Sequence, residues 1–457
     1  MVLVLTVVVL QSISFANYAL TTKTTNIIYG SAPYLTFDGG RTRVTNTEAL
    51  LWISLSDGRK FTPTTNNSSY NPIVLPVAGQ SFNDIGMLVP TNTDSIALSS
   101  LIGTPYNYWG DDDGDGKGID GVTATGSLNL SIYDKDNNPV ARNEVLNICK
   151  APYKLMLSND GGTLKTRYGV PNESRFTAGR AIYYIKPKAS PAICFAQPGS
   201  RSGNGIDYAG PAPTPTWDSY RKFFLIQSVT PSSYGLNFPT TGAHNLYFDL
   251  IFAGTNQALS WAPVSHGGIK ATMTNSTSTS VRVILSGPHW YYSVSEERRP
   301  PSLPQVFELV GRDSSGNAVV KYGFELKQWF FNNGNNPTNY SNVSSFCNHY
   351  GYRLPKVKDL TNASCQRWLS GPECQGAVGA TPSSSFNEAL RHIGAGFFTE
   401  WGEMRVYSDT TYYGGLYWTS DRPSNSNDSF LAVSSHFGGI SSKASRSYSA
   451  YVACVYP

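Results

Sequence analysis

The sequence has few charged residues and no concentration of positive charge. Only 14% of its 457 residues are Asp, Glu, Lys or Arg, and the formal net charge is +4. A protein that binds nucleic acid needs a Lys/Arg patch that displaces counterions from phosphates. We therefore expect no nucleic-acid partner.

Long apolar runs are also missing. No run reaches the ~20 residues that a transmembrane helix needs, so we expect no direct membrane span. The apolar run Val2 to Leu10 is followed by the small residues Ser14 and Ala16, as in a signal peptide, but no Lys or Arg precedes it. Two interpretations stay open: residues 1–16 are a signal peptide, or they are an internal strand of a longer surface protein. Both interpretations predict an extracellular location.

The sequence lacks the short motifs of common hydrolases. None of its six histidines lies in HExxH, and GxSxG does not occur. Glu388 and His392 have a spacing that is far more often a surface ion pair than a metal site. The segment SHGG, Ser265 to Gly268, has no identifiable third member for nucleophilic catalysis, and we interpret it as a turn. We expect a protein that is not an enzyme.

The sequence is rich in the residues of extracellular β-proteins. Aromatic residues make up 13%, with 42 Gly and 28 Pro for turns. The even number of cysteines, without a CxxC pair, indicates disulfides formed in an oxidising compartment. The cysteines are Cys149, Cys194, Cys347, Cys365, Cys374 and Cys454.

Short strand-like segments alternate with turns from about residue 26 to 292. Examples are SLNLSIYD, RAIYYIKP, HNLYFDLIFAG and SVRVILSGP. They predict one or two β-sandwich domains over residues 17–300. Three prolines in Glu296–Gln305 predict a domain boundary, because neither a helix nor a central strand tolerates them. A softer boundary is predicted at Pro211–Trp217.

The region 301–457 has a different pattern. A helix that ends at Gly351 is predicted by apolar residues at i, i+3, i+4 and i+7, which are Val343, Phe346, Cys347 and Tyr350. A second helix is predicted over residues 385–394, because Ser385 and Glu388 form a capping box. Strands are predicted in YYGGLYWTS, SFLAVSS and SYSAYVACVY.

The segment WGDDDGDGKGIDG, residues 109–121, holds five aspartates. Its D-x-D-x-D-G pattern predicts a structural calcium loop, because calcium prefers several oxygen ligands. The loop departs from an EF-hand, since position twelve is Val122 instead of Glu. The alternative is a solvated acidic turn, in which five like charges repel one another. The predicted ligands are Asp111, Asp113, Asp115, the carbonyl of Lys117, and Asp120.

Several segments carry a family resemblance. FCNHYGYRLPKVKDL, LYWTSD and YSAYVACVY resemble a bacterial C-type-lectin-like domain. SAPYLTFDGGRT, YNYWGDDDGDG, ICKAPYKLMLS and VVKYGFELKQWF resemble the C-terminal adhesion region of enterobacterial invasin/intimin-like outer-membrane proteins, the invasin-E type. The resemblance extends from about Ile28 to the end. It implies a mainly β chain: β-sandwich domains followed by an α+β C-type-lectin-like head over residues 301–457.

The resemblance also implies disulfides and a function. It implies the pairs Cys347–Cys454 and Cys365–Cys374, which leaves Cys149 and Cys194 as the third pair. It implies a bacterial cell-surface adhesin that binds a host cell-surface protein or glycan, together with an outer-membrane anchoring partner. The EPN, QPD and WND tripeptides of calcium-dependent sugar binding are absent. Protein recognition, or calcium-free stacking of sugars on aromatic residues, is therefore expected.

Aromatic and arginine residues of the head are the candidates for the binding surface, because such residues supply most interface energy. Trp418 is expected in the core. Two alternatives stay open. One is a structural surface or matrix component; the other is a formylglycine-generating-like enzyme, which Arg353-Leu354-Pro355 resembles and which needs a free cysteine pair. The predicted binding residues are Trp401, Arg405, Tyr407, Tyr412, Tyr413, Tyr417 and Arg422.

Overall fold

The structure is a computed structural model with two compact units. The first unit comprises Met1–Val145 and Pro152–Lys186, and the second comprises Leu146–Ala151 and Pro187–Pro457. The predicted signal segment 1–16 lies outside the described residues. Within the part of the chain that the structure describes, no helix has the length and hydrophobicity to cross a membrane. The described residues are 29–44, 46–116, 121–199, 214–290, 298–365, 374–444 and 447–457.

The first unit contains a five-stranded sheet, a three-stranded sheet and two short strand pairs. The five-stranded sheet has the order β4 (Ile73–Val74), β12 (Gly179–Lys186), β9 (Tyr153–Asn159), β8 (Ser127–Tyr133), β5 (Ser95–Ala97). The three-stranded sheet has the order β11 (Glu173–Phe176), β10 (Gly162–Thr166), β7 (Val122–Thr125). The short pairs are β1 (Tyr34–Leu35) with β6 (Trp109–Gly110), and β2 (Ile53–Ser54) with β3 (Lys60–Phe61). The helices are α1 (Leu98–Ile102) and the 3-10 turns η1 (Thr47–Leu50), η2 (Pro63–Thr65) and η3 (Phe82–Asp84).

The core of the first unit lies against one face of the five-stranded sheet. Side chains of β8 and β9 alternate between buried and half-buried positions, as strands with one covered face do. Phe82 packs edge-on against Tyr153, with 5.7 Å between ring centroids. The Tyr183 hydroxyl donates a hydrogen bond of 2.7 Å to the Leu51 carbonyl, so this buried polar group is satisfied.

The second unit begins with a β-sandwich. One sheet has the order β14 (Trp217–Asp218), β15 (Phe223–Leu225), β13 (Ala192–Pro198), β17 (Tyr247–Ala253), β21 (Ser280–Ser286), β20 (Ile269–Thr274), β19 (Val264–His266). The other has the order β18 (Ser260–Trp261), β22 (Gln305–Arg312), β23 (Ala318–Leu326). Phe248 of the first sheet packs edge-on against Phe324 of the second, with 5.9 Å between ring centroids. The 3-10 turns are η4 (Ile148–Lys150) and η6 (Pro231–Leu236).

The sandwich extends further along the chain than the sequence predicts. The hairpin β22–β23 was expected in the head over residues 301–457, but β22 pairs with β18 of the sandwich. The chain therefore leaves the sandwich after Leu326, and the two units themselves divide at Lys186 and Pro187. The prolines of the proline-rich segment all lie before β22 begins, so they do not interrupt a strand.

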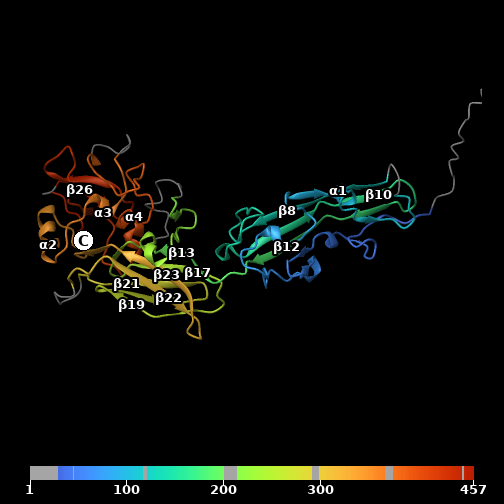
Figure 1. The fold of residues 1–457 in the computed structure, drawn as a ribbon. Coiled ribbons are helices and arrows are strands. Elements are labelled where there is room, and N and C mark those ends of the chain that lie inside the picture. Colours follow the sequence, from blue (N-terminus) through green and yellow to red (C-terminus); the bar gives the residue numbers. More distant parts are fainter. Residues whose placement is uncertain are drawn as a thin grey trace, which may run out of the picture. The chain divides into compact units, whose positions relative to one another are not determined.

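The head follows from Gln328 onward. One of its sheets has the order β16 (Thr241–Ala243), β24 (Gln328–Asn332), β28 (Ala453–Tyr456), with β16 supplied from earlier in the chain. Another has the order β25 (Leu416–Trp418), β26 (Ser429–Ser434), β27 (Ile440–Ala444). Its helices are α2 (Val343–His349), α3 (Val357–Leu360) and α4 (Phe397–Trp401), with 3-10 turns η8 (Tyr340–Asn342) and η11 (Met404–Val406). Figure 1 shows the orange-to-red helices α2, α3 and α4 gathered with β26, next to the green and yellow sandwich strands of the same unit.

The mainly β fold class is confirmed, as are the predicted strands around β8, β12, β17, β21, β25, β26 and β28. The helix predicted from Val343 is also confirmed. It ends before Gly351, whose φ of 81° is the left-handed conformation that favours glycine at a helix end.

The second helix, predicted over residues 385–394, is wrong. The Asn362 side chain takes up both backbone groups of Leu390, accepting from its N–H and donating to its carbonyl, each at 2.9 Å. The Ala389 N–H donates to the Phe437 carbonyl at 2.9 Å. Tertiary partners thus replace the hydrogen bonds within a helix, and the head's last helix, α4, begins only at Phe397.

All three predicted disulfides are present. They are Cys149–Cys194, Cys347–Cys454 and Cys365–Cys374. The first joins η4 to β13, and the second joins α2 to the last strand, β28. They engage all six cysteines of the sequence.

Candidate functional sites

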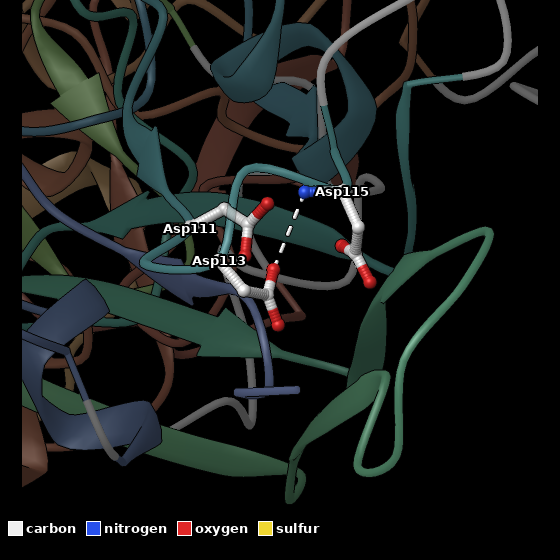
Figure 2. A group of neighbouring side chains, drawn as sticks. All are labelled: Asp111, Asp113 and Asp115. Carbon is white, nitrogen blue, oxygen red and sulfur yellow. Dashed lines mark hydrogen bonds between the residues drawn. The ribbon is translucent and has the colours of Figure 1, made fainter. Parts of the chain in front are cut away.

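The first candidate site is the acidic loop of the first unit. Strand β6 brings the chain to Gly110 by pairing with β1, and the loop starts at Asp111. One carboxylate oxygen each from Asp111, Asp113 and Asp115 lies within 4.8 Å of the others. Figure 2 shows that these side chains come from one short turn and lie close together.

Backbone N–H groups hold two of the three carboxylates in place. The Gly116 N–H donates to Asp111 Oδ2 at 2.7 Å, and the Ser31 N–H donates to Asp113 Oδ2 at 2.6 Å. The Asp115 N–H donates to Asp113 Oδ1 at 3.2 Å, the bond drawn in Figure 2. The hydrogen bond from Ser31 lowers the pKa of Asp113, whereas burial raises the pKa of Asp111.

The remaining carboxylate oxygens have no hydrogen-bond donor. Asp111 Oδ1 and both side-chain oxygens of Asp115 are buried and accept no hydrogen bond from the described residues. Desolvated anionic oxygens are costly unless a cation neutralises them. This donor set consists of hard oxygens and fits a calcium ion, which takes 6–8 of them.

Two glycines from distant segments close around these carboxylates. A Cβ on Gly169 would lie 2.5 Å from Asp115 Oδ2, and a Cβ on Gly30 would collide with Asp113 Oδ2. The Gly30 N–H donates to the Val170 carbonyl at 3.2 Å, which joins the two segments. These neighbours could not be predicted from the sequence, because they lie far from the loop along the chain.

The neighbouring Asp112 has a different environment. Its carboxylate forms an ion pair with Arg43 and accepts a hydrogen bond of 3.1 Å from the Tyr34 hydroxyl. It therefore has partners of its own outside the group of three. The predicted ligands Lys117 and Asp120 lie outside the described residues. Val122 lies in strand β7, so the chain after the loop enters a strand and not an EF-hand helix.

The second candidate site is in the head, and here four of the seven predicted binding residues need correction. Trp401, Tyr407, Tyr412 and Tyr417 are at most 5% exposed and belong to the hydrophobic core. The Trp401 indole N–H donates to the Thr241 carbonyl at 3.0 Å, and Trp418 is buried as expected. These side chains stabilise the head and do not contact a partner at its surface.

Arg422 is exposed but lies apart from the other candidates, against residues at the start of β26. Its guanidinium lies 4.0 Å from the centroid of the Phe430 ring and donates to the Asn427 carbonyl. It thus covers the loop that precedes β26. The two other exposed candidates, Arg405 and Tyr413, lie next to the glycine pair Gly414-Gly415.

We call Arg405, Tyr413, His436 and Tyr451 the Tyr413 surface. Tyr413 is 36% exposed, and its ring stacks on that of Tyr451 with 5.9 Å between centroids. A Cβ on Gly414 would lie 2.5 Å from Arg405 Cδ, and one on Gly415 would lie 2.6 Å from the Tyr451 ring. The glycine pair therefore lets an arginine and a tyrosine pack closely against the same turn. Sequence spacing could not reveal His436 and Tyr451. The pairing of β25 with β26 places His436 near this turn, and a bridge between Tyr417 and Tyr451 places Tyr451 there.

A nearly buried carboxylate positions the basic part of this surface. Glu403 accepts a hydrogen bond of 2.6 Å from Arg405 Nε, and His436 Nδ1 lies 2.9 Å from the same Glu403 oxygen. The side chain of Glu403 is only 7% exposed, while that of Arg405 is 61% exposed. The arginine is thereby held in one orientation with most of its surface available to a partner.

Comparison with known proteins adds a sequence relationship. No family model matches the chain. The inverse autotransporter adhesin YeeJ of Escherichia coli strain K12 is 27% identical over 231 residues, which is 50% of this chain. The predicted resemblance to invasin/intimin-like adhesins is confirmed. The match covers 8% of the relative's length, so the chain corresponds to a small part of that protein.

Two solved structures, of invasin and of intimin, show weak overall similarity to the chain. The bacterial integrin-binding protein invasin gives a TM-score of 0.35 at 13% identity, covering 74% of this chain and 52% of invasin. A 282-residue intimin fragment in complex with the intimin-binding domain of its receptor Tir gives 0.33 at 11% identity, covering 73% of this chain and 93% of the fragment.

Proposed function

We propose that this chain is the adhesive part of a bacterial cell-surface protein and that its head binds a host cell-surface protein. The sequence relationship to an inverse autotransporter adhesin supports an adhesive role at the outer membrane. The chain is proposed to be held there by an anchoring partner or by further chain. Binding is non-catalytic in this proposal.

The observation that carries the proposal is the Tyr413 surface. It combines two stacked tyrosines with an arginine that is ordered by Glu403 before any partner arrives. Tyr and Arg are enriched among the residues that dominate binding energy, and ordering in advance lowers the entropy lost on binding. A surface of this composition suits a protein partner, because Tyr and Arg are enriched at protein–protein interfaces.

Calcium has a structural role in this proposal. The loop lies in the first unit, whereas the Tyr413 surface lies in the second. Calcium would be held by Asp111, Asp113 and Asp115, and it would neutralise their buried oxygens without taking part in receptor contact.

The enzyme alternative receives no support from the cysteines. A formylglycine-generating-like mechanism needs a free cysteine pair, while every cysteine of the sequence is engaged in a disulfide. The second alternative, a structural component, differs from an adhesin by showing no saturable binding to host cells.

The proposal is tested by adhesion of the purified chain to cultured epithelial cells. The wild-type chain should bind saturably, and the double variant Arg405→Ala with Tyr413→Ala should bind at least about tenfold more weakly, as for hot-spot residues. Tyr220→Ala is the matched control, because Tyr220 is a 90% exposed tyrosine of the same unit outside this surface.

Two outcomes would overturn the proposal. Absence of saturable binding by the wild-type chain would favour the structural component. Binding that the double variant retains in full would move the receptor site away from the Tyr413 surface. Circular dichroism of each variant checks that the fold is retained.

A further inference from the structure

A pocket of about 420 Å³ opens in the sandwich of the second unit, outside the head. Its volume lies in the range of about 300–1,000 Å³ typical of small-molecule sites. Its lining combines basic side chains, a hydroxyl, a histidine, glycine backbone and prolines. The lining residues are His244, Gly267, Gly268, Lys270, Ser286, Gly287, Pro288, Arg299, Pro300 and Pro301.

One wall is the SHGG turn that the sequence singles out. Gly267 and Gly268 have φ values of 60° and 89° and form the turn between β19 and β20, as a tight hairpin requires. The lack of a side chain at Gly267 lets the Ser302 backbone pack against the turn, since a Cβ there would lie 2.5 Å from the Ser302 carbonyl oxygen. The Ser302 N–H donates to the Gly267 carbonyl at 2.8 Å and so fixes the segment that carries Arg299 against the turn.

The floor places a lysine opposite a hydroxyl. Lys270 of β20 is directly paired with Ser286 of β21, so both side chains lie at the same level of the sheet. The next residue, Gly287, donates its N–H to His244 Nδ1 at 3.3 Å. The His244 ring stacks on His289, with 3.5 Å between centroids, which makes this side of the pocket rigid.

The charge of the lining is of one sign. It includes the cations Lys270 and Arg299, both exposed, and no Asp or Glu among the described lining residues. Such groups favour a carboxylate or sulfate, which accepts charge-assisted hydrogen bonds. Pro288, Pro300 and Pro301 add flat apolar faces beside the polar groups, a combination that suits a sugar ring with one apolar and several polar edges.

We propose that this pocket binds an acidic saccharide, one that carries a carboxylate or a sulfate. Lys270 and Arg299 contact the acidic group, while Ser286 and the glycine backbone contact hydroxyls and the prolines contact the ring. The site is distinct from the Tyr413 surface and gives the chain a second, glycan-directed contact with a host cell.

The experiment is calorimetric titration of the full chain with sialyllactose, sulfated lactose and neutral lactose. At least one acidic sugar should bind at one site, at least tenfold more tightly than lactose. Lys270→Gln and Arg299→Gln should each weaken that binding at least tenfold. Lys321→Gln, an exposed lysine of β23 in the same sandwich, should leave it unchanged.

The proposal is overturned if neither acidic sugar binds saturably, if lactose binds equally well, or if Lys270→Gln binds like wild type. Tighter binding of an aspartate-rich peptide than of both acidic sugars would also overturn it in favour of a protein ligand. Because calorimetry with free sugars measures the pocket and cell adhesion of the Arg405→Ala with Tyr413→Ala variant measures the head, failure of the pocket and failure of the receptor proposal are distinguishable.

Discussion

Glu400 of α4 accepts two hydrogen bonds from Thr241, one from its N–H at 2.9 Å and one from its hydroxyl at 2.6 Å. The same carboxylate accepts from Thr240 and from the Gly394 N–H. Burial raises the pKa of Glu400, and these hydrogen bonds oppose the rise. One buried carboxyl thus joins the helix of the head to the strand β16, which the chain supplies before the last sandwich strands.

We expect Glu400→Ala to destabilise the second unit by about 3–5 kcal/mol, because it leaves the buried N–H and hydroxyl groups of Thr240 and Thr241 without an acceptor. Urea unfolding measures this change. Glu325→Ala is the matched control, since the Glu325 side chain is partly exposed and lies 3.9 Å from Lys327, a surface pair worth less than about 1 kcal/mol. Equal stability of the two variants would contradict the structural role of Glu400.

Calcium should raise the melting temperature of the wild-type chain, and a chelator should reverse the increase. The double variant Asp113→Ala with Asp115→Ala should melt at the same temperature with and without calcium, because it removes two of the three converging carboxylates. Differential scanning calorimetry at several calcium concentrations measures the shift.

Asp112→Asn is the control for charge in this loop. It removes one negative charge next to the three carboxylates but leaves their oxygens in place, and Asp112 has its own partners in Arg43 and Tyr34. Its calcium response should match that of wild type. A wild-type melting temperature that ignores both calcium and chelator would refute the metal site.

His244 should make stability depend on pH. Burial, and then repulsion from His289, lower the pKa of His244 from 6.5 to about 4. The unfolded chain therefore binds this proton at a higher pH than the folded chain, so stability is greatest above about 6.5 and falls as pH decreases toward about 4. After a discount for partial exposure, the loss is about 1–2 kcal/mol.

The pH effect is isolated by comparing variants. Urea unfolding of His244→Gln between these pH values should show a smaller loss of stability than that of wild type. The remaining titratable groups contribute equally to the wild type and to the variant. Identical slopes for wild type and His244→Gln would contradict this prediction.

Removal of the disulfides should destabilise the chain in the order of the loops they close. The Cys347–Cys454 bond spans 107 residues and the Cys365–Cys374 bond spans nine, so the chain-entropy model gives about 5 and about 2.5 kcal/mol. Paired Cys→Ala variants, compared by urea unfolding, measure both. A larger loss from the short loop would contradict this order.

Local patterns predicted local structure well. The helix from Val343 follows from apolar residues on one face and a glycine stop, and both features are present in the structure. The predicted helix over residues 385–394 had an equally good capping box. It failed because Asn362, which is remote in sequence, binds the backbone of Leu390. A capping box cannot report such a partner.

The burial of individual aromatic residues could not be predicted from the sequence for a related reason. Tyr412 and Tyr413 are identical and adjacent, yet the first is 5% exposed and the second is 36% exposed. Which one faces solvent depends on contacts with Phe397 and Tyr451, both far from them along the chain. The acidic loop shows the same limit, since its aspartates were evident and Gly30 and Gly169 were not.

The bond between Cys347 and Cys454 also bears on resistance to proteases. Arg405, Tyr413, His436 and Tyr451 all lie between these two cysteines in the sequence. A single cut in this interval leaves both fragments covalently joined, because the bond bridges the break. A secreted protease must therefore cleave the head twice to detach its exposed aromatic face, and a nicked molecule keeps that face attached to the rest of the chain.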